Sequence, residues 1–241
     1  MGVMIRIALF LVALAASLLP RAGWETAAAA QREACAATAA NGAPAPRCRE
    51  RRVRGARPLP TWRETAIVDD RRRLRRWREA VVEALAEARA AGHGAAIARE
   101  GALLDPDAAI RGATLPQGEY RCRTLKLGSR GVEGLAFVDY PAFRCRVAPG
   151  PDGLMHFTRF GGSQRPVGRL FAEHDLRQIF LGALQLGDER TALRYGRDRE
   201  RNMAGVVERI GERRWRIVFP YPHFESIADV VELSYLPPES R

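Results

Sequence analysis

The stretch GEYRCRTLKL, residues 118–127, begins the part of the chain that decides the fold. Tyr120 and Cys122 alternate there with charged residues, a period of two that is typical of a β-strand. Similar short runs continue toward the C-terminus and are separated by Gly, Pro and Asp. The pattern predicts eight strands, at residues 118–127, 135–147, 154–160, 167–171, 178–185, 203–210, 214–219 and 228–235.

No long helical pattern separates these strands, which favours an antiparallel meander over parallel βαβ units. Eight strands within residues 118–236 are enough to close a small sheet on itself, and closure removes the edges that an open sheet must protect. The predicted fold is therefore mainly β with an N-terminal helix (α+β), built as an antiparallel eight-stranded up-and-down barrel. A β-sandwich is the alternative.

A helix is predicted before the strands. Thr61 and Glu64 have the spacing of a capping box, and Gly92 is a typical stop signal. Asp69 lies one turn before Arg73, so we expect these two residues to pair on the exposed side. The apolar stripe, which we expect to pack on the barrel, consists of Ile67, Leu74, Trp77, Val81, Leu85 and Ala88.

The first 22 residues have the features of an export signal. Arg6 supplies a positive charge, and the apolar run that follows is too short to span a bilayer. We therefore expect a periplasmic or secreted protein that does not span the membrane. The expected organisation is a signal peptide (1–22), an Ala/Pro/Arg-rich linker (23–60), a helical segment that packs on the barrel (61–117) and the barrel domain (118–236).

The chain has four cysteines. In an exported protein these suggest two disulfides, for which three pairings are possible. We favour Cys35–Cys48, which lie close together, and Cys122–Cys145, which both stand between two arginines in strand-like runs. No Cys-x-x-Cys or His-x-x-x-His spacing occurs, and the histidines are scattered, so we expect no metal centre and no cofactor.

The net charge of +11 is concentrated in one segment. Residues Arg47 to Arg78 contain thirteen arginines and four acidic residues, so the rest of the chain is close to neutral. Such a segment suits contact with an anionic surface, whereas a solvated linker and helix exterior would have the same composition. We expect no specific nucleic-acid binding.

Two connections contain candidate ligand-binding residues. The Gly- and Pro-rich string at 161–168 is typical of a turn, in which Gln164 and Arg165 could present donors to a carboxylate or phosphate at a barrel mouth. The long connection 186–202 is either a salt-bridged surface or a polar lid with Tyr195 as a stacking or hydrogen-bonding element. Its other candidate residues are Asp188, Arg197 and Asp198.

Several motifs resemble an uncharacterised family of exported proteobacterial proteins, known as a domain of unknown function. The resemblance covers most of residues 61–235 and implies no activity. The motifs that carry it are Gly118–Arg123, Leu125–Gly128, Gly162–Gly168, Leu181–Gly182, Leu186–Glu189, Tyr195–Asp198, Met203–Ile210 and Phe224–Ser226.

A weaker resemblance rests on the Gly-x-aromatic opening at Gly118–Tyr120, an early cysteine pair and Gly-rich later strands. This combination is similar to lipocalin-like periplasmic barrels, including the bacterial inhibitors of metalloproteases and lysozymes. Tyr120 stands where the lipocalin opening has Trp. The likeness implies a lipocalin-like architecture and a binding role.

Three functions are therefore considered. The first is an exported non-enzymatic binding or inhibitory module, which takes a small ligand at one mouth or an envelope protein on its loops. The second is an envelope-associated structural or interaction protein that docks through Arg47 to Arg78. The third is a hydrolase, for which the sequence has no phosphate loop, dinucleotide fingerprint or nucleophile elbow.

Overall fold

The computed structural model describes residues 58–131 and 136–237. The strands that it contains are β1 (Gly118–Leu127), β2 (Phe137–Asp139), β3 (Phe143–Pro149), β4 (Met155–Phe160), β5 (Gln164–His174), β6 (Arg177–Leu186), β7 (Asn202–Gly211), β8 (Arg214–Pro220) and β9 (Ala228–Leu236). The helices before them are α2 (Trp62–Thr65), α3 (Val68–Arg75), α4 (Trp77–Ala88), the π-turn η2 (Arg89–His93), α5 (Gly94–Glu100) and the short η3 (Gly101–Leu103).

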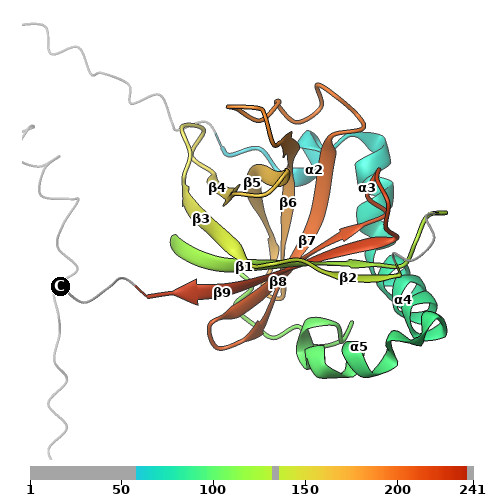
Figure 1. Cartoon of the computed structure of the whole chain (residues 1–241). Helices are drawn as coiled ribbons and strands as arrows, with labels where there is room; N and C mark the ends of the chain where they lie inside the picture. The colour runs from blue at the N-terminus through green and yellow to red at the C-terminus, as the bar shows by residue number, and fades with distance from the viewer. Residues whose placement is uncertain (1–57, 132–135, 238–241) are drawn as a thin grey trace, which may run out of the picture. The chain divides into compact units, whose positions relative to one another are not determined.

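The strands form a closed antiparallel barrel (Figure 1). Each strand from β3 to β9 pairs with the next one along the chain, and β9 returns to β1 over nearly the whole length of both strands. The predicted eight-stranded up-and-down barrel is confirmed, and the β1–β9 pairing is the contact that an open sandwich would lack. The predicted signal peptide, the Cys35–Cys48 pairing and the arginines before Pro58 lie outside the described residues.

One predicted strand, 135–147, is wrong as a single element, because it divides into β2 and β3. Pro141 stands between them; it has no amide proton for a ladder and restricts the residue before it. β2 pairs with the second half of β1, and β3 pairs with the first half. The connection between β2 and β3 therefore lies beside Arg123 and Thr124, in the middle of β1.

The barrel has apolar residues on both of its faces. The inward-facing set, which we call the interior core, includes Tyr120, Phe157 and Phe180. The outward-facing set packs with the helices, which contact β7, β8, β9 and β1. Figure 1 shows α3 and α4 along one side of the barrel. Two buried faces explain why β6 is buried at every residue except its ends.

Two interior glycines make room for this aromatic core. Gly168 and Gly182 face each other across β5 and β6, and a Cβ on either would lie 2.6 Å from the ring of Phe180. Phe180 in turn makes edge-to-face contacts with Phe157 and Phe219. The aromatic rings therefore occupy the space that the two missing side chains leave.

The predicted disulfide Cys122–Cys145 is confirmed, with a Cα–Cα distance of 6.0 Å. It joins β1 to β3, and both cysteines belong to the interior core. The bond therefore joins two strands that are already neighbours in the barrel wall.

The predicted helix is interrupted. The capping box of Thr61 and Glu64 is present, but α2 ends at Thr65 because Ala66 is extended. Gly92 adopts φ +91°, as expected for the residue at which the helix stops, and a second short helix, α5, begins at Gly94. None of the helices among the described residues is long and apolar enough to cross a membrane.

The predicted Asp69–Arg73 pair is wrong. Arg73 pairs with Asp70, while Asp69 lies 4.0 Å from Arg72. Asp70 is fully buried, and Tyr195 donates a hydrogen bond to it. A buried carboxylate needs a cationic partner more than an exposed one does, so Arg73 pairs with Asp70.

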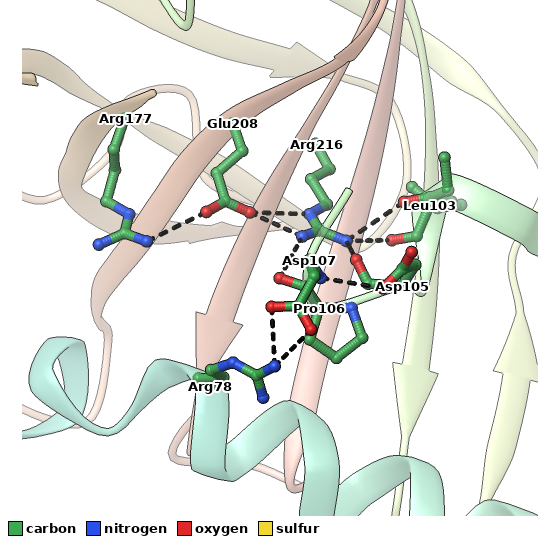
Figure 2. A network of polar contacts seen from close by, with 9 residues as sticks. Arg78, Leu103, Asp105, Pro106, Asp107, Arg177, Glu208 and Arg216 are labelled. Carbon is green, nitrogen blue, oxygen red and sulfur yellow. Dashed lines mark hydrogen bonds and ion pairs between the residues drawn. The ribbon is translucent and has the colours of Figure 1, made fainter. Parts of the chain in front are cut away.

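A buried ion pair joins the helical segment to the outer face of the barrel (Figure 2). Glu208 on β7 and Arg216 on β8 face each other, and both side chains are 1% exposed. The guanidinium also donates to the backbone carbonyls of Leu103 (2.9 Å) and Asp105 (2.6 Å). Arg216 therefore satisfies carbonyls at the end of the helical segment, which has no further turn to bond them.

Candidate ligand-binding site in the mouth of the barrel

One end of the barrel interior holds a cavity of about 340 Å³, which we call the mouth cavity. Inward-facing residues of β1, β4, β5, β6, β7, β8 and β9 form its walls. The β2–β3 connection, the β4–β5 turn and the β8–β9 loop form its rim. Its lining residues are Thr124, Lys126, Tyr140, Pro141, Phe143, Arg159, Gly162, Ser163, Gln164, Pro166, Leu184, Met203, Phe219, Glu225, Asp229 and Val231.

The deeper part of the interior is filled by side chains. Tyr120 is fully buried, contacts Trp215 and Tyr235 edge to face, and donates a 2.6 Å hydrogen bond to the Pro116 carbonyl. Phe219 belongs to this aromatic core and also lines the mouth cavity. The interior therefore has a packed apolar half and a hollow polar half, with Phe219 at the boundary.

Arg159 is the most unusual residue in the cavity wall. The residue is 7% exposed, and its Nη1 donates to Thr124 Oγ1 at 2.9 Å. Its Nε is buried and has no hydrogen-bond partner, and no carboxylate within the described residues is in ion-pair range. The Phe143 ring, 4.6 Å from Cζ, covers one face of the guanidinium.

Burial of this kind is costly. A charged group taken out of water needs an ion-pair partner and a full set of hydrogen bonds to recover its solvation. Desolvation lowers the pKa of the Arg159 guanidinium, with Asp229 acting in the opposite direction. An arginine nevertheless stays charged, so the cavity wall contains a cation with unused donor capacity.

Lys126 is the second cation of the cavity. Its ammonium donates to Glu225 Oε2 at 2.6 Å and to Gln164 Oε1 at 3.2 Å. Burial opposes its charged form, but Asp229 and Glu225 outweigh that effect, and its pKa is raised. Lys126 is therefore a satisfied cation, in contrast to Arg159.

Asp229 lies at the centre of this charge cluster. It is 8% exposed, and Ser226 donates a 2.5 Å hydrogen bond to its Oδ1. Burial raises its pKa, and the neighbouring charge of Glu225 acts in the same direction. Lys126 and Arg159 oppose the rise without cancelling it. The carboxyl group can therefore change protonation state at a higher pH than an exposed aspartate would.

The rim residue Glu225 is held in an unusual backbone conformation. Its φ of +64° is in the left-handed region, which a residue with a Cβ rarely adopts. Arg130 supports it by donating its backbone N–H to the Glu225 carbonyl at 2.8 Å. Such strain is often found at functional sites, and here it places the carboxylate of Glu225 on Lys126.

A smaller annex of about 30 Å³ adjoins the mouth cavity and shares Lys126 and Asp229 with it. Asn202 and His223 also line the annex. The Nδ2 of Asn202 is buried without a partner, and burial lowers the pKa of His223, with Arg73 acting in the same direction. The annex has room for one or two water molecules, and its polar walls suit them.

Of the residues predicted to bind ligand, Gln164 lies in the mouth cavity. Arg165 points away from the mouth cavity. It donates to four backbone carbonyls, which lie in the turn before β5, at the end of β6 and in the connection that follows β6. The acceptors are Gly162 (2.9 Å), Leu186 (2.5 Å), Gly187 (3.3 Å) and Glu189 (2.9 Å). The turn predicted at 161–168 is shorter than expected: Gly161 and Gly162 have positive φ, but β5 already begins at Gln164.

The four predicted residues of the 186–202 connection are not among those that line the mouth cavity. Tyr195 donates to Asp70 and accepts a 3.1 Å hydrogen bond from the Ile67 amide, so it anchors the connection to α3. Burial raises its pKa, and Asp70 adds to the shift. Asp188 and Arg197 are exposed, and Asp198 lies 3.9 Å from Arg201.

Sequence reasoning missed Lys126, Arg159 and Asp229, although a signal for them exists. Inward positions follow every second residue of a strand, so Cys122 leads to Lys126 on β1 and Phe157 leads to Arg159 on β4. A charged residue at the next inward-facing position of such a strand indicates that this part of the barrel interior is polar. Within the described residues, no group of three or more His, Cys, Asp or Glu side chains is placed to hold a metal ion.

The chain belongs to the family described as domain of unknown function (DUF4893), whose family model matches residues 62–233. The match includes the helices and the strands that form the barrel, and it confirms the predicted membership in a family of unknown function. Searches of curated proteins and of solved structures returned no match. The family description names no activity, so the geometry of the mouth cavity has to carry the functional argument.

Proposed function

We propose that this member of the DUF4893 family is a binding protein that takes a small ligand into the mouth of its barrel. The observation that carries the proposal is the contrast within the barrel interior. One half is packed with aromatic side chains, whereas the other contains about 340 Å³ of free volume walled by buried charged groups. That volume falls in the usual range for small-molecule sites.

Stability gives no reason for this arrangement. An apolar side chain in place of Arg159 would pack against Phe143 without the cost of an unpaired buried charge. Polar groups left without partners in a native structure call for an explanation such as a bound ion or ligand. A ligand that completes the hydrogen bonds of Arg159 supplies that explanation.

The methionine methyl groups offer a direct test. The chain has four methionines, of which Met203 lines the mouth cavity and Met155 packs against the interior core outside it. In a ¹³C-methyl NMR titration with a library of small organic fragments, we expect saturable shifts at Met203 and none at Met155. If no fragment moves the Met203 signal, the proposed function fails.

A cavity-filling variant provides the control. Leu184→Trp would place an indole in the mouth cavity while leaving its charged groups in place. We expect this variant to keep its fold, as judged by near-ultraviolet circular dichroism, and to lose the Met203 shifts. Unchanged binding would place the fragment elsewhere and contradict the proposal.

Export and the disposition of the N-terminal part belong to the same proposal. The Cys122–Cys145 disulfide is compatible with an oxidising compartment. We propose cleavage of a signal peptide near residue 22, a linker to residue 60, and a periplasmic or secreted mature protein. Mass spectrometry of the N-terminus after expression with the whole leader tests this, and an uncleaved chain would contradict it.

Docking on an anionic surface is a second candidate function. Arg71 and Arg75 have no carboxylate within ion-pair range among the described residues, and both line a groove of about 420 Å³ that also contains Trp62 and Trp77. Binding of this kind weakens steeply with salt, whereas binding in the mouth cavity is screened less. Co-sedimentation with anionic vesicles at low and high salt distinguishes the two.

A further inference from the structure

We infer that the ligand of the mouth cavity is a monocarboxylate with a short apolar body, and that Arg159 binds its carboxylate. The inference rests on the proposed function and adds the chemical class of the ligand. Three features of the cavity carry it: the donors that remain free, the balance of its charges, and the apolar surface beside them.

The free donors converge on an anion. Among the described residues the Arg159 guanidinium donates one hydrogen bond, from Nη1 to Thr124, and its fork suits the two oxygens of a carboxylate. Thr124 Oγ1 accepts from Arg159, so its own hydroxyl proton is available to the ligand. Gln164 accepts from Lys126 through Oε1, which leaves its amide group as a further donor.

The charge balance selects a single negative charge. The cavity contains two cations, Arg159 and Lys126, and two carboxyl groups, Glu225 and Asp229. Lys126 and Glu225 neutralise each other at 2.6 Å. With Asp229 protonated, Arg159 is then the cation left for the ligand, whereas with Asp229 ionised the four charges already sum to zero. A doubly charged phosphate would leave one negative charge without a counter-charge in a buried site.

The cavity also has an apolar part. Phe143, Leu184, Met203 and Phe219 line it together with Pro166, and Phe219 also belongs to the interior core. An alkyl or aromatic group beside the carboxylate would bury its surface there. The arrangement therefore recognises a carboxylate at one end and a hydrophobic group at the other.

Asp229 makes the binding dependent on pH. The charged and polar groups that face it are Lys126 from β1, Arg159 from β4, and Glu225 and Ser226 from the β8–β9 loop. Its ionised form would repel a carboxylate on Arg159, whereas its protonated form would not. Binding of the anion therefore favours proton uptake by Asp229, and affinity should rise as the pH falls from alkaline values.

The test compares two probes of nearly the same shape, 3-phenylpropionate and 3-phenylpropionamide, by the Met203 methyl shift. We expect the carboxylate to bind at least about tenfold more tightly than the amide. Arg159→Met should reduce carboxylate affinity by at least about tenfold and amide affinity by less, because the amide loses only a hydrogen bond to a neutral oxygen. Asp229→Asn, measured above neutral pH, should increase carboxylate affinity.

The opposite directions of the two variants exclude general damage to the site, which would weaken binding in both. Equal affinity for the two probes, or no effect of Arg159→Met, would overturn the carboxylate assignment and leave the proposed function intact. Tighter binding of 2-phenylethylphosphonate than of 3-phenylpropionate would also overturn it, because it would assign a dianion. If neither phenyl compound nor any library fragment moves the Met203 signal, the proposed function itself fails.

Discussion

Arg216 and Arg159 are both buried in the barrel wall, but on opposite faces and in opposite states. Arg216 faces outward beneath the helical segment, where Glu208 and backbone carbonyls occupy its donors (Figure 2). Arg159 faces inward, has one hydrogen bond to a threonine, and adjoins a cavity. Both arginines are buried, so burial does not distinguish their roles. Their hydrogen-bond and ion-pair partners do distinguish them.

The comparison separates an outer network, in which the charged groups have partners, from a mouth cavity, in which one charged group lacks them. The outer network joins β7, β8 and the end of the helical segment, and each member stabilises its neighbours. The mouth cavity contains a charged group whose contacts the described residues leave unfinished. We therefore expect substitutions in the outer network to affect stability, and substitutions in the mouth cavity to affect binding.

The largest effect is expected for Arg216→Met. It removes the closer of the two cations that pair with Glu208, leaving Arg177 at 3.2 Å, and it leaves the Leu103 and Asp105 carbonyls without a donor, which should cost about 3–5 kcal/mol in the free energy of unfolding. Urea denaturation of the oxidised protein measures this value. The double variant Glu208→Leu with Arg216→Met should recover part of the loss, since it also removes the buried Glu208 carboxylate, whereas Arg177, the other partner of Glu208, is 26% exposed. A single variant as stable as the parent would contradict a structural role for Arg216.

The next effect is expected at Asp229. Asp229→Asn removes the negative charge beside Arg159 and keeps an oxygen that can accept from Ser226. Above neutral pH, affinity for 3-phenylpropionate should increase by up to about tenfold, as expected for removal of a like charge in a partly buried site. In the parent protein, affinity should rise as the pH falls through the raised pKa of Asp229. Binding titrations at several pH values measure both effects. If the affinity of the variant depends on pH as strongly as that of the parent, Asp229 is not the group that causes the pH dependence.

A small effect on stability is expected for Arg159→Met. The variant loses one hydrogen bond to Thr124 and the contact with Phe143, but it also loses the cost of an unpaired buried charge. We expect the free energy of unfolding to stay within about 1 kcal/mol of the parent, or to rise. Urea denaturation of Arg159→Met and Arg216→Met in parallel measures the difference. A loss of stability in Arg159→Met as large as that in Arg216→Met would contradict the view that Arg216 stabilises the fold and Arg159 does not.

The smallest effect is expected for Arg78→Ala. Arg78 pairs with Asp107 close to the outer network, but its side chain is 50% exposed and that of Asp107 is 72% exposed. Exposed pairs of this kind contribute at most about 1 kcal/mol. A change in the melting temperature of a few degrees at most should be seen by calorimetry. A loss as large as that of Arg216→Met would show that solvent exposure is not what separates the two pairs.

The strands could be predicted because their signal is local. Alternation around Tyr120 and Cys122 indicates a strand, and the number of strands with short connections indicates closure. The disulfide followed from the matching sequence contexts of its two cysteines. The break at Ala66 escaped prediction because neither Gly nor Pro marks it, and the break at Pro141 was overlooked although the residue itself signals one.

The site was harder to predict, because it depends on which residues of different strands share one level of the barrel. Arg159, Lys126 and Asp229 lie on β4, β1 and β9, and only the strand register brings them together. Arg165 stands next to a residue of the cavity, yet the alternation of the strand directs it to backbone carbonyls instead. Neither composition nor motifs indicate whether a side chain at such a position points into the cavity or toward backbone carbonyls.

A crystal structure of the protein with 3-phenylpropionate tests the central claim most directly. Our account predicts the carboxylate within hydrogen-bond distance of the Arg159 guanidinium, the phenyl group against Phe219 and Met203, and the Glu208–Arg216 pair unchanged. A mouth cavity that stays filled with water at saturating probe, or a probe bound away from Arg159, would contradict it.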